Sequence, residues 1–319
     1  MGKKVLLIYG LPQGSILGPL LFILYLSDLP SVIAQFDISS HLYSDDSNLY
    51  SAFDPSDFRS AMENVKNCMS CIESWMNQHY LKLNVSKTEV LFIGKKQHIS
   101  IHKPSIELGE KLFQSSINAN VRSLGAYLDA TLSMKAMINE QAKSCHFNLR
   151  KIGRIRNCLN TTDRLLLVKA FVLNKLDYCN ILLSTVPVSY LKPLQKVLNY
   201  AMRFAYCLKK RTSVSSYLKE SHILPIVFRI KFKCCVTVYQ ILNNLSPTYL
   251  DDFVQVKFPS EFSLRSNMDT LQLLEPSNRK SIQYALSKHW NELPFNIRSS
   301  INVTTFKSCL KTHYFDLAY

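Results

Sequence analysis

The sequence has no long apolar run, and this absence excludes a transmembrane helix. The longest run, Leu17–Leu26, is about half of what a helix needs to span a bilayer, and it contains Gly18 and Pro19. The apolar stretch that follows Lys3 and Lys4 is too short for the hydrophobic region of a signal peptide. We therefore expect an intracellular protein, nuclear or cytoplasmic, that is not secreted and has no membrane partner.

The cysteines lack the number and spacing of a disulfide framework or a zinc site. There are nine, an odd number, scattered over 319 residues, which suits reduced thiols. Cys68 and Cys71 form a CxxC pair, but no second CxxC or histidine pair follows at zinc-site spacing. Because apolar residues recur every three or four positions around the pair, we interpret it as core cysteine in a helix.

Acidic residues are scarce, with 23 Asp and Glu against 38 Lys and Arg and a formal net charge of +15. Such a surface favours polyanions, nucleic acid first and an anionic membrane face second. The imbalance is local, because residues 1–135 carry 12 charges of each sign while residues 136–319 carry 26 basic and 11 acidic ones. Residues 143–233 hold 18 basic and three acidic residues. This basic region indicates a nucleic-acid surface; a solvated helical face or a contact with an acidic protein are the alternatives.

Hydrophobic periodicity predicts an α+β first part and a mainly helical remainder. The first part is expected to contain a Gly/Pro loop, two helices and several strands, which in chain order are the loop Gly10–Gly18, a helix from Pro19 to Leu29, two strands within Ile38–Phe53, a helix over 56–79, and strands at Glu89–Ile93, near Ile101–Leu108 and at Ser123–Leu128. Composition places a boundary near residue 135. A helix over 137–156 then has one apolar stripe, with basic residues off it.

Two basic clusters are the candidate nucleic-acid contacts. The first lies on the helix over 137–156, off its apolar stripe, and the second follows a helical pattern that ends at Leu208. Their members are Lys143, Arg150, Lys151, Arg154 and Arg156 in the first cluster, and Lys209, Lys210 and Arg211 in the second. Lysine and arginine at such positions contact phosphates without reading the base sequence.

Asp45 and Asp46 form the sharpest chemical feature, because the pattern places them at the tip of a hairpin. Adjacent carboxylates offer hard oxygen ligands for Mg²⁺, which takes one or two protein carboxylates together with substrate phosphates. This arrangement is typical of a phosphoryl-transfer site. For an isolated Asp-Asp pair the alternative is a solvated turn, since Asp and Ser are ordinary turn residues.

Four short motifs in order indicate a family. They are Gly10–Pro19 (GLPQGSILGP), Tyr43–Asp46 (YSDD), Leu83–Thr88 (LNVSKT) and Ser123–Asp129 (SLGAYLD). In order and approximate spacing they are similar to successive palm motifs of reverse transcriptases, and the chain resembles the reverse transcriptase of non-LTR retrotransposons. Four further segments resemble the C-terminal part of that family: Leu176–Leu183 (LDYCNILL), Arg229–Lys233 (RIKFK), Trp290–Pro294 (WNELP) and Phe306–Tyr314 (FKSCLKTHY).

The resemblance implies roles for matching residues. Asp45 and Asp46 would be Mg²⁺ ligands, with Tyr43 and Ser44 shaping their turn and Ser44 standing where alanine is more usual. Gln13 and Gly14 would line the pocket for nucleotide and template, Lys87 would protonate the departing pyrophosphate, and Leu124 and Gly125 would belong to the hairpin that grips the primer end. The implied partners are an RNA template and a DNA primer, held by the basic helices acting as a thumb.

The resemblance also implies a gap. Two-metal nucleotide addition takes ligands from an earlier palm strand as well as from YSDD, and no carboxylate precedes Gly10. We therefore expect the first catalytic aspartate, the fingers and any upstream endonuclease to be absent, and the chain to be unable to perform RNA-directed DNA synthesis alone.

The expected divisions are a partial palm at 1–135, a thumb-like region at 136–215 and a helical C-terminal region at 216–319. A non-enzymatic nucleic-acid-binding protein and a translated retrotransposon relic without function are the alternatives.

Overall fold

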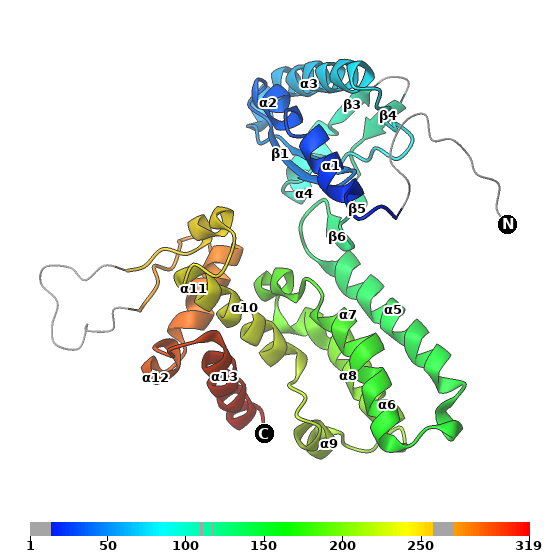
Figure 1. Ribbon diagram of the computed structural model, residues 1–319, viewed down its shortest axis with the longest axis vertical. Helices are drawn as coiled ribbons and strands as arrows, with labels where there is room; N and C mark the ends of the chain where they lie inside the picture. Colours follow the sequence, from blue (N-terminus) through cyan, green and yellow to red (C-terminus); the bar gives the residue numbers. More distant parts are fainter. Residues whose placement is uncertain (1–13, 109–110, 117, 258–270) are drawn as a thin grey trace, which may run out of the picture. The chain divides into compact units, whose positions relative to one another are not determined.

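The structure is a computed structural model that describes residues 14–108, 111–116, 118–257 and 271–319 (Figure 1). Its short antiparallel strand pairs and many helices confirm the predicted α+β class. The chain forms two compact units, which we call the N-terminal unit, up to Val121, and the C-terminal unit, Arg122–Tyr319. The divisions predicted at residues 135 and 215 stay predictions. None of the helices in the described residues is long and apolar enough to cross a membrane.

The N-terminal unit is built around one long amphipathic helix. Its elements are α1 (Gly18–Tyr25), α2 (Leu29–Ala34), β1 (Ser39–Tyr43), β2 (Asp46–Tyr50), α3 (Phe58–Gln78), α4 (Lys96–His102), β3 (Ser105–Leu108), β4 (Lys111–Gln114) and the start of β5 (Asn120–Ser123). One face of α3 buries Cys68, Ile72 and Trp75 against α2 and Ile38. Cys68 is fully buried while Cys71 is exposed, so only the first cysteine of the CxxC pair is a core residue. Burial raises the pKa of the Cys68 thiol.

One strand prediction in this unit was wrong, and a second placed the start of its strand too early. Residues Glu89–Ile93 form no strand; Val90 and Phe92 instead pack against the small core of Met62, Ile106 and Leu108. The alternating apolar residues therefore contribute side chains to this core, but no neighbouring strand among the described residues pairs with their backbone, as a β-ladder requires. Further on, residues 101 and 102 belong to α4. The left-handed backbone of Lys103, with φ of 40°, ends that helix, and β3 begins only at Ser105.

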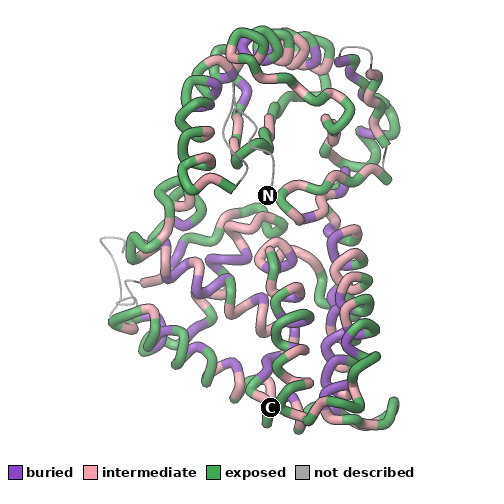
Figure 2. Tube along the Cα trace, turned by 45° about the vertical axis from the view of Figure 1, so that its right-hand side comes forward, coloured by how far each residue is buried: buried purple, intermediate pink, exposed green. Residues whose placement is uncertain are grey.

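The C-terminal unit is almost entirely helical. Its elements are β6 (Ala126–Asp129), α5 (Lys135–Gly153), α6 (Thr161–Val168), α7 (Asn174–Asp177), α8 (Lys192–Ala205), α9 (Ser215–Glu220), α10 (Ile226–Leu242), α11 (Ile282–Asn291), α12 (Phe295–Arg298) and α13 (Val303–Ala318). A π-helical segment, Lys169–Leu173, joins α6 to α7. Buried residues run along the long helices (Figure 2) and form one continuous core from Met134 to Tyr314.

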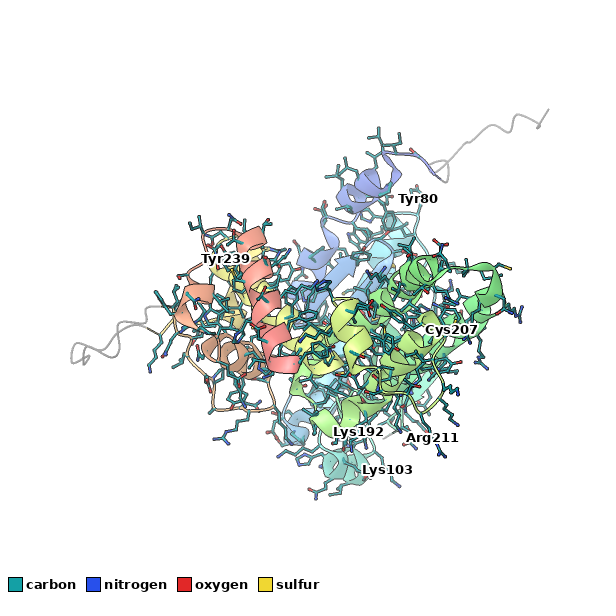
Figure 3. The ribbon with its side chains drawn as sticks, turned by 90° about the horizontal axis from the view of Figure 1, so that it is seen from below. Tyr80, Lys103, Lys192, Cys207, Arg211 and Tyr239 are labelled. Carbon is teal, nitrogen blue, oxygen red and sulfur yellow. The ribbon has the colours of Figure 1, made fainter. Side chains whose placement is uncertain are left out.

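The C-terminal motifs supply much of this core. Trp290 and Phe306, from WNELP and FKSCLKTHY, are almost completely buried. The ring of Phe306 on α13 stacks on that of Tyr239 on α10 with 4.4 Å between centroids, so this ring pair joins the two helices (Tyr239 is labelled in Figure 3). The indole nitrogen of Trp290 donates a hydrogen bond to the Leu271 carbonyl at 2.7 Å. The residues of these motifs therefore stabilise the packing of the C-terminal unit.

Candidate active-site hairpin and nucleic-acid interface

The Asp45–Asp46 pair lies at the tip of the β1–β2 hairpin, in the arrangement that the sequence predicted. Tyr43 pairs with Asp46, which leaves Ser44 and Asp45 as a two-residue turn. Ser44 adopts a left-handed φ of 54°, and such a turn follows the twist of the flanking strands. Leu42 and Leu49 pack against the core of the N-terminal unit while both aspartates are exposed. The core thus anchors the hairpin and leaves its carboxylates accessible.

Two carboxylates form only part of a two-metal ligand set. In the described ranges no group of three His, Cys, Asp or Glu side chains is placed to hold a metal ion. Within the same residues, neither Asp45 nor Asp46 has an ion-pair partner. Two carboxylates with open surroundings suit one Mg²⁺ that keeps waters or takes substrate phosphates. They do not by themselves account for the ligands of two metals.

The other predicted palm residues lie on separate segments of the N-terminal unit. Lys87 is exposed in a turn, where its backbone N–H donates to the Asn84 carbonyl at 3.1 Å. Gly14 has a φ of +88° and open space around it, since an added Cβ would meet nothing within 4 Å. Tyr43 is 66% exposed beside the Asp pair. Gln13 lies outside the described residues.

Leu124 and Gly125 form the tip of a second hairpin, between β5 and β6. Their φ angles of 45° and 85° are both positive, as in a type I′ turn. The hydroxyl of Tyr178 donates to the Leu124 carbonyl, and its ring lies 3.3 Å from where a Cβ on Gly125 would stand. Gln141 of α5 in turn donates to the Tyr178 carbonyl at 2.9 Å. The hairpin tip is therefore fastened to the helical unit.

Gly125→Ala is expected to destabilise the protein by roughly 1 to 2 kcal/mol, because alanine is strained at positive φ and its methyl group would press on Tyr178. Chemical denaturation of the full chain measures this change. Gly153→Ala is the matched control: Gly153 ends α5 with no atom in the way of a Cβ, so its replacement should stabilise by up to about 1 kcal/mol. Equal effects of the two variants would contradict the turn geometry.

Asp129, the last residue of the SLGAYLD motif, holds the loop that leads into α5, a role that the motif alone did not predict. Its carboxylate accepts hydrogen bonds from the backbone N–H and the hydroxyl of both Thr131 and Ser133, at 2.8 to 3.2 Å. Burial opposes its ionisation, but these four donors outweigh burial and lower the pKa of the carboxyl. Asp129 thereby shapes the loop that starts α5. Polar residues two and four positions after an aspartate are the signal that could have revealed it.

A basic and aromatic face runs along α5. Lys143, Arg150, Lys151 and Arg154 are all exposed, and their spacing puts them on one side of the helix, opposite its buried stripe. Phe147 lies among them, 51% exposed, with the Lys151 ammonium 4.7 Å from its ring centroid. Lys143 also lies 3.5 Å from the Glu140 carboxylate, an exposed pair of little energetic weight. We call Lys143, Phe147, Arg150, Lys151 and Arg154 the α5 face.

The second basic cluster follows α8, which runs beside α5 in the same direction (Figure 1). Lys135 at the start of α5 lies over Tyr190, just before α8, and Arg156 beyond the end of α5 lies 6.0 Å from the ring centroid of Phe204, near the end of α8. Lys209, Lys210 and Arg211 are exposed just past that same end, and Arg211 lies at the surface of the unit (Figure 3). The fold therefore brings Arg154 and Arg156 of the first cluster to the same end of the helix pair as the second cluster, while Lys143 lies near the middle of α5. Arg156 is only half exposed.

Residues 4–147 match a family model described as reverse transcriptase (RNA-dependent DNA polymerase). The matched range includes both hairpins and Lys87, and it ends within α5. This part of the chain is therefore related to reverse transcriptases. A comparison with curated proteins found no match.

Proposed function

We propose that the chain is a part of a reverse transcriptase of the non-LTR retrotransposon type, in which the helical C-terminal unit holds a template–primer duplex. The observation that carries the proposal is the YSDD hairpin, whose exposed carboxylate pair lies within the segment related to reverse transcriptases. The concentration of basic residues on α5 and after α8 supports the thumb-like role. Phosphate contacts of this kind position a duplex without selecting its sequence.

The proposed metal site uses Asp45 and Asp46 as two of its ligands. Mg²⁺ would supply charge neutralisation for the phosphates of a bound nucleotide. Since the described residues offer no third ligand nearby, further ligands would have to come from outside them. We propose that the chain alone binds nucleic acid but does not extend a primer, because Asp45 and Asp46 by themselves do not supply the ligands of two metals.

A primer-extension assay tests whether the chain binds nucleic acid without extending a primer. The full chain is incubated with an RNA template, an annealed DNA primer, dNTPs and Mg²⁺, and duplex binding is measured in parallel. We expect binding without extension. The Asp45→Asn/Asp46→Asn variant should bind the duplex at least as tightly as the unmodified chain, because two negative charges have been removed. Extension that disappears in Asp45→Ala would overturn the proposed inactivity.

A non-enzymatic nucleic-acid-binding protein is the second candidate function, and exposed aromatic residues on the α5 face and next to it favour it. Phe147 and Phe171 are about half exposed, and the Asn148 side chain joins their helices by donating to the Phe171 carbonyl at 2.8 Å. Exposed aromatic rings among cations stack single-stranded bases. Tighter binding of single-stranded RNA than of the RNA–DNA duplex would favour this candidate over the template–primer role.

A further inference from the structure

Three of the C-terminal motifs converge on one pocket in the C-terminal unit, although they are far apart in the sequence. The pocket has a volume of about 350 Å³, within the range of small-molecule sites. Its lining includes Asp177 and Asn180 from LDYCNILL, Arg229, Phe232 and Lys233 from RIKFK, and Lys311 from FKSCLKTHY. It contains no residue of the α5 face or of the cluster that follows α8.

The side chains that line this pocket carry more positive than negative charge. Arg229 forms a two-pronged ion pair with Asp177, in which its Nε donates to the carboxylate at 2.8 Å and its Nη2 also contacts the carboxylate. This pair uses the one carboxylate of the lining. Lys233 and Lys311 are both exposed, and neither forms a salt bridge within the described ranges. Two ammonium groups are thus available for an anion from solvent.

The rest of the lining is partly polar and partly apolar. Asn180 is only 3% exposed; its amide nitrogen lies 3.4 Å from the Asp177 carboxylate, and its side-chain oxygen has no hydrogen-bond partner in the described part of the chain. A buried acceptor without a donor is unusual in a folded protein, and this oxygen itself is not accessible from the pocket. Phe232 and Leu224 line the pocket as well and supply apolar surface.

We infer that this pocket binds a nucleotide, with the phosphate on Lys233 and Lys311 and the base against Phe232. Ammonium groups beside an aromatic ring match the two halves of a nucleotide, since charge-assisted bonds hold phosphate and the ring offers a stacking surface. A free nucleotide and a terminal nucleotide of an RNA strand share this chemistry. The inference is independent of polymerase activity and of the proposed role of the α5 face.

Titration of the full chain with AMP, inorganic phosphate and a 5′-phosphorylated RNA oligonucleotide tests the inference. The Lys233→Gln/Lys311→Gln variant should bind AMP at least tenfold more weakly than the unmodified chain. Lys280→Gln/Lys288→Gln removes the same charge from two exposed lysines outside the pocket and should leave AMP affinity unchanged. Unaltered thermal unfolding of both variants checks that the fold is intact.

The probes also separate the two sources of the nucleotide. If the pocket substitutions weaken oligonucleotide binding by a larger factor than AMP binding, the pocket receives a strand end; if AMP loses at least as much, it receives a free nucleotide. Either result supports a nucleotide pocket. Equal AMP affinity in the pocket and control variants would overturn the inference, as would inorganic phosphate binding as tightly as AMP.

Discussion

Replacing Phe306 by alanine is expected to lower the free energy of unfolding by about 3 to 5 kcal/mol. Phe306 is fully buried, stacks on Tyr239 and lies 5.8 Å from the ring centroid of Trp290. The substitution therefore leaves a cavity among large rings that cannot close without moving α10, α11 or α13. Urea denaturation of the full chain followed by circular dichroism measures the loss.

Phe295→Ala is the matched control for this prediction. Phe295 begins α12 in the same unit but is 51% exposed, so its truncation should change stability by no more than about 0.5 kcal/mol. A small effect of Phe306→Ala, comparable to the control, would contradict the assignment of the C-terminal motifs to the core. Because the same core contains the buried side of α5, we also expect Phe306→Ala to weaken nucleic-acid binding.

Removing charge from the α5 face is expected to weaken binding of an RNA–DNA duplex and to reduce its dependence on salt. The variant Arg150→Gln/Lys151→Gln/Arg154→Gln replaces three exposed cations. Each phosphate contact that is lost should flatten the slope of log affinity against log salt by roughly 0.9, through the release of fewer counterions. Three lost contacts would therefore reduce the slope by about 2.7. Fluorescence anisotropy over a series of salt concentrations provides both quantities.

A variant of equal charge in the N-terminal unit separates a local interface from general electrostatics. Lys82, Lys95 and Lys96 are exposed and lie outside the predicted contacts. Their replacement by glutamine removes the same charge and should leave the slope nearly unchanged. If both triple variants lower the affinity and flatten the salt slope equally, the α5 face acts only through the overall positive charge and is not a specific interface. A slope of zero for the unmodified chain would refute nucleic-acid binding through phosphates.

Features with a strong local pattern could be predicted from the sequence. The hairpin around Asp45 and Asp46 was predicted because strand-forming residues flank a turn-forming tetrapeptide, and the structure places the turn within it. The α5 face follows from a helical period that holds across the whole of α5. In both cases the residues that decide the conformation are close together in the chain.

Features that depend on distant partners could not be predicted. Glu89–Ile93 has the composition of a strand, but a strand exists only where another one pairs with it. The pocket formed by LDYCNILL, RIKFK and FKSCLKTHY requires the packing of α7, α10 and α13, which no local pattern shows. For the same reason, no local pattern predicts that residues 209–211 lie at the same end of the helix pair as Arg154 and Arg156, because this depends on the parallel course of α5 and α8.

Photo-crosslinking from the α5 face shows whether a bound duplex lies against it. A photoreactive phenylalanine analogue is placed at Phe147, within the face, or at Phe295, which has the same exposure of 51% but lies outside it. The full chain is then irradiated with a labelled RNA–DNA duplex. We expect efficient crosslinking from position 147 and little from position 295. Equal crosslinking from both positions, or a stronger signal from position 295, would contradict this expectation.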